Sequence, residues 1–225
     1  GQTLAMPASK IGARGYIAFA GGIDTPPWLG SRSTFHQAGV GGMEGHALKK
    51  GQVIPVAKTK GTPGKRVKSD CRPAISTDKT WSIEVVPGPN DDWIDEAGHK
   101  RFLSTDWKLS AKNARTGFRL DGPDWTFTEK ATKKAPENGS EPSNIIDQGY
   151  PMGAINLSGQ TPIILVNDGP SMGGFINPYT VPSAAFWKLG QSKPGDIYRF
   201  KSVTVDEAQA LRKKLNAVCS PSSIM

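Results

Sequence analysis

Short apolar runs divided by glycine and proline turns recur along the chain and predict many short β-strands. Residues 81–86 alternate apolar and polar positions, which is typical of a strand with one buried face. Residues 162–166 lack this alternation, so we expect that strand to be buried on both faces. Further strands are predicted at residues 14–20, 52–56, 107–110, 117–120, 153–157 and 196–200.

Three segments carry helix signals. Asn90 or Asp91 is placed to cap a helix that runs through Phe102, and a second helix is expected near residues 183–189. Thr204 and Glu207 form a capping box for a third, C-terminal helix. Its apolar positions recur every three or four residues, so we expect that side to pack on the rest of the fold. These positions are Val205, Ala208, Leu211, Leu215 and Val218.

The balance of elements favours one fold class. The predicted strands are short and outnumber the helices, and residues 126–148 are polar enough to form a surface loop. Glycine and proline together account for 44 of the 225 residues, without a Gly-X-Y period, which excludes collagen. We therefore expect a mainly β barrel with peripheral helices.

Composition narrows the classes of function. No apolar run approaches the roughly 18 residues of a membrane span, so we expect no membrane partner. The two cysteines, Cys71 and Cys219, are too few for a disulfide framework and suit a reducing cytoplasm. The three histidines show no metal-ligand spacing, so no metal site is predicted.

The net charge of +8 is concentrated in one stretch. Residues 49–80 hold nine basic residues against two acidic ones, a net charge of +7. Nucleic-acid readers usually place aromatic side chains among their basic ones, and this stretch has no aromatic residue. We interpret residues 57–80 as a solvated basic linker and expect no nucleic-acid partner.

Three loops could carry chemistry, although phosphate-binding loops, dinucleotide fingerprints and nucleophile elbows are all missing from the sequence. Residues 167–174 leave a buried strand, so Asp168 would be partly desolvated there, or would bond its own backbone in a tight turn. Residues 30–35 combine Arg32 with hydroxyl groups, and residues 113–119 combine Asn113 with two arginines. Each loop could equally be a turn with surface charges.

Seven segments stand out as ordered motifs, at residues 16–24, 29–34, 39–45, 86–89, 113–120, 167–174 and 187–196. Taken in this order, they resemble the carboxyltransferase half of urea carboxylase, in the urea amidolyase family. Bacterial relatives of that family include the C-type component of 5-oxoprolinase and KipA-type proteins. The ending at residues 166–175 is more similar to the urea carboxylase branch than to the oxoprolinase branch.

The resemblance implies cyclophilin-like β-barrels. The family sequence normally extends ahead of Gly1, so we expect residues 1–56 to form the last part of a first, incomplete barrel. The basic linker at 57–80 would lead into a second barrel at 81–203, with a C-terminal helix and tail at 204–225. The biotinyl-lysine signature and the ATP-grasp carboxylase are both absent from the chain, so we expect this piece to be inactive alone.

The resemblance also implies a reaction: transfer of a carboxyl group from carboxybiotin to urea, giving allophanate. Biotin would be carried by a separate domain, and ATP would be used by another, the biotin carboxylase. A second, KipI-like carboxyltransferase half would complete the component. Two alternatives stay open, namely a subunit of an ATP-dependent 5-oxoprolinase and a non-enzymatic regulator that binds a kinase.

Candidate site residues follow when this reaction is placed on the loops described above, with Asp168 chosen because it follows a buried strand. Asp168 would orient the urea or accept its proton, with Asn113 as the second catalytic candidate. Arg32 would hold the carboxyl group. The other predicted substrate- or biotin-binding residues are Ser33, Thr34, Asn156, Asn167, Gly173 and Gly174.

Overall fold

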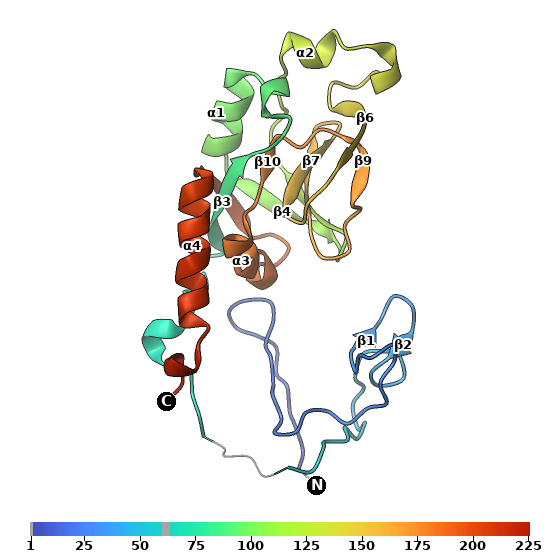
Figure 1. Cartoon of the computed structure of the whole chain (residues 1–225), viewed down its shortest axis with the longest axis vertical. Helices are drawn as coiled ribbons and strands as arrows, with labels where there is room; N and C mark the ends of the chain where they lie inside the picture. Colours follow the sequence, from blue (N-terminus) through green and yellow to red (C-terminus); the bar gives the residue numbers. More distant parts are fainter. Residues whose placement is uncertain (1, 60–63) are drawn as a thin grey trace. The chain divides into compact units, whose positions relative to one another are not determined.

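The computed structural model describes residues 2–59 and 64–225, and the chain divides into two units (Figure 1). Unit 1 comprises Gly1–Arg14 and Ser69–Ser223, and unit 2 comprises Gly15–Lys68 with Ile224–Met225. Both hydrophobic clusters of the described residues belong to unit 1. Unit 1 is therefore the part of the chain with a conventional core.

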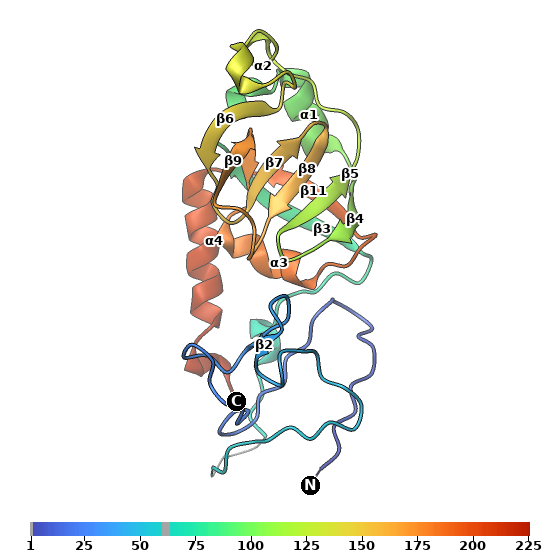
Figure 2. The ribbon, with the colours of Figure 1, turned by 90° about the vertical axis from the view of Figure 1, so that its right-hand side faces the viewer.

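Seven strands of unit 1 close into a barrel, in the order β10-β3-β11-β4-β5-β8-β7. Figure 2 looks onto the side formed by β4, β5, β8 and β7. Strands β3 and β11 pair in parallel, and every other neighbouring pair in the barrel is antiparallel. The closed barrel confirms the mainly β class with peripheral helices. Its strands are β3 (Thr80–Pro87), β4 (Trp107–Asn113), β5 (Gly117–Asp121), β7 (Ala154–Ser158), β8 (Thr161–Leu165), β10 (Tyr179–Thr180) and β11 (Ile197–Ser202).

The other elements of unit 1 surround this barrel (Figure 1). A separate two-stranded antiparallel sheet is made of β6 (Asn144–Gly149) and β9 (Met172–Phe175). The helices are α1 (Glu96–Ser104), α2 (Glu129–Thr132), α3 (Phe186–Gln191) and α4 (Val205–Val218). Short 3₁₀ helices lie at Ser69–Cys71, Asp91–Trp93, Pro136–Asn138, Ser183–Ala185 and Pro221–Ser223.

Alternation along the strands decides which side chains fill the barrel. In β3, Trp81, Ile83 and Val85 are buried in the core, while the residues between them are less buried. This is the arrangement that the alternating sequence of residues 81–86 predicts. The predicted hairpins 107–120 and 153–166 are also confirmed, as β4–β5 and β7–β8.

Aromatic rings fill the centre of the barrel. Phe102, on α1, has no exposed surface and stacks on Tyr179 and Phe200 with ring centroids 4.5 and 4.4 Å apart. It also contacts Trp107 and Trp125 at tilted angles. Such ring pairs add to the free energy gained from burying apolar area. Phe102 is thus the side chain that joins α1 to both sides of the barrel.

Helix α1 begins later than the sequence suggested. Asp91 starts a 3₁₀ turn that ends at Trp93, and the cap of α1 is Asp95, whose carboxylate accepts a hydrogen bond from Gly98 N at 2.7 Å. The prediction of a cap at Asn90 or Asp91 is therefore wrong. The reason is tertiary: Ile94 bridges to Phe127, which holds it in extended backbone and separates the two helical turns.

Replacing Asp95 with alanine is expected to lower the free energy of unfolding by about 0.5–2 kcal/mol, because the first turn of α1 loses its cap. The Thr126 hydroxyl, followed by Gly98 N, lowers the pKa of Asp95 below its usual value. The stabilisation is therefore present at neutral pH and is lost as the pH falls through that lowered pKa. Denaturant unfolding of both proteins across the acid range checks this; an Asp95→Ala deficit that stays constant to the lowest pH would contradict it.

The capping box of α4 is confirmed, since Glu207 N donates to Thr204 Oγ1 and Thr204 N donates to the Glu207 carboxylate. The helix packs on β3 and on the Ser183–Ala185 turn, as predicted, and Figure 1 shows its C-terminal part continuing past them. The apolar stripe is covered only in part: Ala208 is buried, but Val205 and Leu211 are 60% and 36% exposed.

Unit 2 has little regular structure in its described residues. Strands β1 (Thr34–Phe35) and β2 (Val40–Gly41) pair with each other, and Ile23 bridges to Val56. The strands predicted at 14–20 and 52–56 are wrong, because Tyr16 and Val53 are 88% and 83% exposed and have no sheet to pack on. The boundaries predicted from the resemblance, 1–56, 57–80, 81–203 and 204–225, stay predictions.

The two segments predicted to lack regular structure, residues 126–148 and the basic linker at 57–80, both contain some. The segment 126–148 contains α2, a 3₁₀ turn and most of β6, so its interpretation as a simple surface loop is wrong. In the basic linker, residues 60–63 lie outside the described residues. Within the rest of the linker, Val67 bridges to Ile224, and Ser69–Cys71 forms a 3₁₀ turn.

Candidate functional site

Asp168 is fixed against the turn between β4 and β5. Its backbone N donates to Arg115 O at 2.8 Å, and its two carboxylate oxygens accept from Arg115 Nε and Nη2 at 2.6 and 2.9 Å. Nearby, Val166 N donates to Thr116 O. These bonds join the loop after β8 to the β4–β5 turn at one end of the barrel. We call Arg115 and Asp168 with these two loops the clamp.

The clamp determines the charge of Asp168. The Arg115 guanidinium, by hydrogen bond and then by charge, lowers the pKa of the Asp168 carboxyl below its usual value, although partial desolvation acts the other way. Asp168 also raises the pKa of Arg115. A carboxylate whose pKa is lowered is a weaker base, so this geometry suits Asp168 for orienting a group better than for accepting a proton.

Asn113 lies in the same hairpin as Arg115. Its Oδ1 accepts from Arg119 N at 3.0 Å and its Nδ2 donates to Ser110 O. These bonds span the irregular register between Leu109 and Asn113, so the amide holds the shape of the hairpin. Asn167 precedes the clamp aspartate and is exposed.

Asn156, Gly173 and Gly174 are associated with the β6–β9 sheet and the outer side of β7. Ile155 and Leu157 enter the main core, so Asn156 faces the other side of β7, as does Ala154, which packs with Tyr150 and Leu165. A Cβ at Gly173 would lie 2.9 Å from the Tyr150 ring, and one at Gly174 would lie 2.9 Å from Ile145 O. Glycine therefore allows β9 to lie this close to the Tyr150 ring and to its partner strand β6.

Arg32 and Ser33 line a hollow of about 480 Å³ within unit 2. Arg32 Nη1 donates to Asp24 Oδ1 at 3.0 Å and to Thr25 O, which fixes the guanidinium beside the hollow. Thr34 does not line it: its hydroxyl packs against Gly42, where a Cβ would clash. The walls combine apolar and charged residues, chiefly Ile17, Phe19, Ile23, Asp24, Arg32 and Ser33.

The predicted site residues thus form separate groups. Within unit 1, Asn113, Asn167 and Asp168 lie around one hairpin and its neighbouring loop, while Asn156, Gly173 and Gly174 belong to β7 and β9. The hollow with Arg32 lies in unit 2.

Sequence reasoning did not single out Asp24 or Tyr150. The Tyr150 hydroxyl donates to Phe175 O at 2.8 Å and accepts from Phe175 N at 2.6 Å. Asp24 could have been found, because it ends the first segment that carries the resemblance.

Part of the motif at 187–196 is structural. Gln191 Oε1 accepts from Ala13 N and Arg14 N, both at 3.1 Å, and its Nε2 donates to Arg14 O at 3.1 Å. Asp196 Oδ2 accepts from Trp81 Nε1 at 2.8 Å. These side chains bind the N-terminal segment 9–14, which we call the strap, and the first barrel strand, β3, so this part of the motif has a structural role.

Across residues 2–59 and 64–225, His, Cys, Asp and Glu side chains do not gather in threes in a way that could hold a metal ion. In the same residues, each helix is too short or too polar to cross a bilayer.

The family comparison extends over nearly the whole chain. The family described as "Carboxyltransferase domain, subdomain A and B" matches residues 1–202. The urea amidolyase of Lachancea kluyveri is 39% identical over 96% of this chain, which covers 12% of that protein. The C-type component of the 5-oxoprolinase of Escherichia coli is 31% identical over 95% of this chain, which covers 64% of that protein.

A solved structure supports the same relationship. The urea carboxylase of Kluyveromyces lactis matches 90% of this chain and 19% of its own length, with a TM-score of 0.75 and 34% identity. The chain therefore spans a small part of the urea amidolyase and urea carboxylase proteins it matches. With the closed barrel, the ordered motifs and the match over residues 1–202, the chain belongs to the family of carboxyltransferase domains, subdomains A and B.

Proposed function

We propose that this chain is part of the carboxyltransferase component of a biotin-dependent urea carboxylase. The observation that carries the proposal is the 39% identity to a urea amidolyase over 96% of the chain. Carboxybiotin, delivered by a carrier domain, supplies the activated carboxyl group. One urea nitrogen forms a bond to the carboxyl carbon while the bond from that carbon to the biotin nitrogen breaks. The proton lost by urea is taken up by that biotin nitrogen, and allophanate is the product.

The hollow of unit 2 fits an anionic group next to an apolar ring. Arg32 is held by Asp24 and Thr25 through Nη1, and the described contacts leave its Nη2 and Nε without a partner. A guanidinium placed in this way can bind a carboxylate with two parallel hydrogen bonds. Ile17, Phe19 and Ile23 supply apolar wall. In this proposal Arg32 binds the carboxyl group with Ser33 as a nearby hydroxyl donor, while Thr34, whose hydroxyl packs against Gly42, supports the loop.

The clamp of unit 1 would orient the acceptor. Asp168 stays ionised beside Arg115, so its carboxylate can receive hydrogen bonds from urea N–H groups at neutral pH. Urea is a weak nucleophile, and holding it in a fixed orientation is a contribution that a carboxylate can make without bonding to it covalently. Asn113 acts through the hairpin that it stabilises. Asn156, Asn167, Gly173 and Gly174 remain candidates for hydrogen bonds to urea or biotin.

The test is an assay of the native polypeptide that carries this chain, together with its biotin carboxylase, its biotin carrier and the second carboxyltransferase half. With ATP and bicarbonate present, we expect urea to stimulate ADP release and to yield allophanate. Avidin, which sequesters biotin, should abolish both. Urea-independent turnover that is insensitive to avidin would contradict the proposal.

A second candidate is supported by the match to the C-type component of 5-oxoprolinase, which the chain covers to 64% of its length. In that case the chain would act in ATP-dependent opening of the 5-oxoproline ring, without biotin. The same assay separates the two functions, because replacing urea by 5-oxoproline would then give ADP release and glutamate in the presence of avidin.

A further inference from the structure

Three buried polar side-chain atoms of the described residues have no hydrogen-bond partner at the junction of the β6–β9 sheet with the barrel. They are Ser143 Oγ, Asn156 Oδ1 and Asn177 Oδ1, in residues that are 1%, 3% and 0% exposed. A buried polar atom without a partner costs free energy, so a folded protein normally supplies one. We call these three residues the polar junction. A fourth such atom, Trp125 Nε1, belongs to the aromatic core.

Backbone hydrogen bonds bring the three residues of the polar junction together. Ile176 N donates to Ser143 O at 2.9 Å, and Leu157 N donates to Ile176 O at 3.2 Å. Ile176, which directly precedes Asn177, is therefore bonded both to Ser143 and to Leu157, the residue after Asn156. The chain passes here from β9 to β10, out of one sheet and into the other.

The two asparagine amides also share a side of the barrel. Asn156 lies on the outer side of β7 with Ala154, because Ile155 and Leu157 enter the core. Thr180 is registered opposite Ala154, and Asn177 Nδ2 donates to Thr180 Oγ1 at 3.3 Å. The Asn177 side chain is therefore bonded to Thr180, which lies opposite Ala154. Ala154 and Asn156 are on the same side of β7.

The backbone around Asn177 is held in place by the motif at residues 86–89 and by Asn90, which follows it. Asn177 N donates to Asn90 Oδ1 at 2.8 Å, and Gly88 N donates to Pro178 O at 2.8 Å. A Cβ at Gly88 would lie 2.2 Å from Asn177 O, so only glycine permits this approach. The Pro-Gly-Pro motif, which the proposed mechanism does not use, therefore serves to position Asn177.

We infer that the polar junction is a binding site for a small hydrogen-bond donor. Asn156 Oδ1 and Asn177 Oδ1 are acceptors only, and Ser143 Oγ can both accept and donate. The ligand must therefore offer at least two O–H or N–H hydrogens. Two kinds of ligand meet this requirement: an ordered water molecule, and a urea-like amide through its NH₂ group.

The inference rests on the proposed function only if the ligand is an amide. Its readouts are electron density and thermal stability, and neither of them requires carboxyl transfer. An occupied junction in a protein without urea-dependent turnover would leave the inference standing and remove the proposed function. A dry junction in an active urea carboxylase would do the reverse.

The first experiment is a high-resolution crystal structure of the native protein, grown without amides and again with millimolar urea. We expect density for a bound molecule at hydrogen-bond distance from at least two of the three oxygens. A single rounded peak in both crystals identifies water, and planar density that appears with urea identifies the amide. A junction without density, or one closed by protein groups alone, would overturn the inference.

The second experiment uses the sign of a stability change. If a molecule occupies the junction, Asn156→Leu removes one of its hydrogen-bond acceptors. Tm should then fall by about 2–4 °C for each kcal/mol of unfolding free energy that is lost. If it is empty, the apolar isostere removes an unpaired atom and should leave Tm unchanged or raise it, which would overturn the inference. Asn216→Leu, at an exposed position of α4, is the matched control and should change Tm little.

A pair of probes then tests donor chemistry if the crystals show planar density. Urea offers four N–H hydrogens and tetramethylurea offers none. We expect millimolar urea to raise the Tm of the native protein, and to raise that of Asn156→Leu less, while tetramethylurea has no effect on either. An equal rise with tetramethylurea would overturn the role of hydrogen-bond donation at the junction.

Discussion

Asp168→Asn is expected to lower urea-dependent carboxyl transfer by about 100-fold in the native polypeptide, with little change in folding. Arg115 loses its charged partner, and a neutral amide cannot accept both of its hydrogen bonds. The loop then no longer holds its position relative to the β4–β5 turn, and small misplacements of this kind cost about 100-fold in rate. Steady-state kinetics at saturating and limiting urea would separate kcat from KM, and we expect kcat to fall more.

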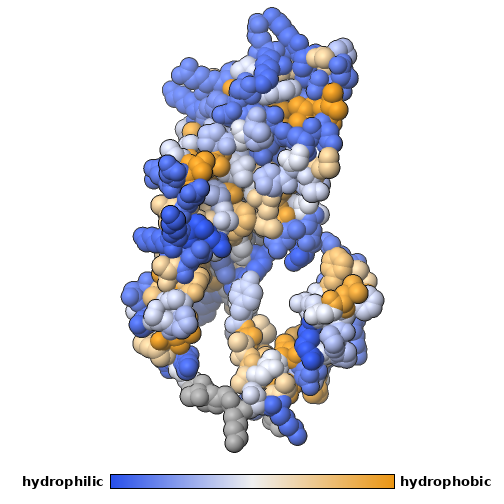
Figure 3. Space-filling model, viewed as in Figure 1, coloured by the Kyte–Doolittle hydropathy of each residue, from blue (hydrophilic) through white to orange (hydrophobic). Residues whose placement is uncertain are grey.

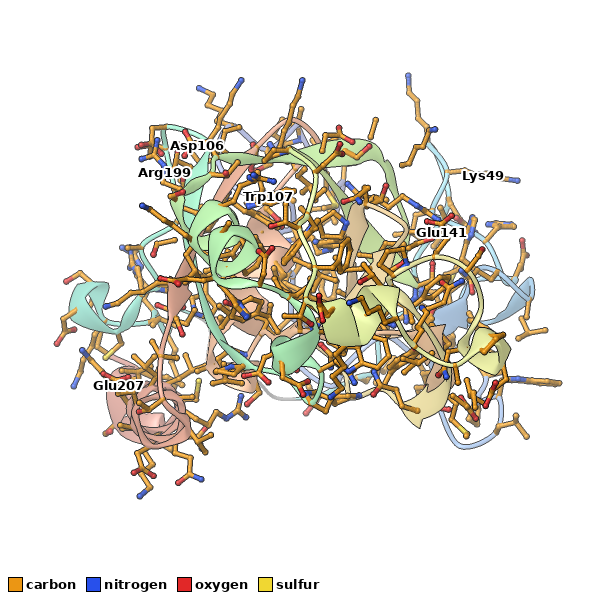
Figure 4. The ribbon with its side chains drawn as sticks, turned by 90° about the horizontal axis from the view of Figure 1, so that it is seen from above. Lys49, Asp106, Trp107, Glu141, Arg199 and Glu207 are labelled. Carbon is orange, nitrogen blue, oxygen red and sulfur yellow. The ribbon has the colours of Figure 1, made fainter. Side chains whose placement is uncertain are left out.

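The chain offers a matched control for this substitution. Asp106 and Arg199 form a second two-bond pair, with N–O distances of 2.6 and 2.8 Å and about half of each side chain exposed, and Figure 4 shows them side by side. Asp106→Asn breaks an ion pair of the same geometry that joins the residue before β4 to β11 and includes neither clamp residue. It should leave transfer unchanged, as exposed ion pairs contribute little to stability. Equal losses in both variants, or none in Asp168→Asn, would contradict a positioning role for the clamp.

The pH dependence of carboxyl transfer tests whether the charge of Asp168 matters. If Asp168 had only a structural role, a change in its pKa would not shift this pH dependence. Arg115 lowers the pKa of Asp168, so the carboxylate keeps its charge to a lower pH than an ordinary aspartate does. Carboxyl transfer that depends on this charge should therefore continue below the usual pKa of an aspartate, and it should be lost once the pH falls through the lowered pKa of Asp168. In Arg115→Gln, the pKa of Asp168 returns toward its usual value, so the acid limb of the profile should move to higher pH.

Phe102→Ala is expected to lower the free energy of unfolding by about 3–5 kcal/mol, the usual range for removing a buried aromatic ring. The ring is fully buried and contacts Tyr179, Phe200, Trp107 and Trp125, so the cavity would open among groups that cannot easily close it. Guanidinium chloride is the suitable denaturant, since urea is the proposed substrate. Near-UV circular dichroism of the buried tryptophans follows the barrel itself.

The control for this measurement is Ile146→Ala. Ile146 is 67% exposed on β6, and Figure 3 shows an apolar spot on the surface beside that strand. Shortening an exposed side chain should change the free energy of unfolding by no more than about 0.5 kcal/mol. A loss below about 1 kcal/mol for Phe102→Ala would mean that the aromatic centre is loosely packed and collapses around the smaller side chain.

The barrel could be predicted from the sequence wherever alternation reports burial. Residues 81–86 became β3 and the hairpin 153–166 became β7–β8, because one face of each strand meets the core. The same propensities failed at 14–20 and 52–56, where the described residues of unit 2 offer no packed sheet. The stripe on α4 is covered only in part for a related reason: periodicity identifies an apolar side, but the surrounding fold decides how much of that side is buried.

The candidate site was predictable in part. Ordered motifs directed attention to Arg32, Asn113 and Asp168, and the structure places the last two around one hairpin and its neighbouring loop. Sequence alone could not show that Asp168 is paired with Arg115, since the two are 53 positions apart. Asn177 gave no signal because its burial comes from two sheets that meet only in the folded chain.

The route of the polypeptide between the two units has a practical consequence for dissecting the protein. The backbone passes from one unit to the other after Arg14, after Lys68 and after Ser223, so one protease cut after Lys68 yields two fragments that each hold residues of both units. A shortened protein starting at Ser69 would also lack the strap that Gln191 and Lys193 bind through Ala13, Arg14 and Ser9. Neither half can be taken out as one uninterrupted stretch of sequence.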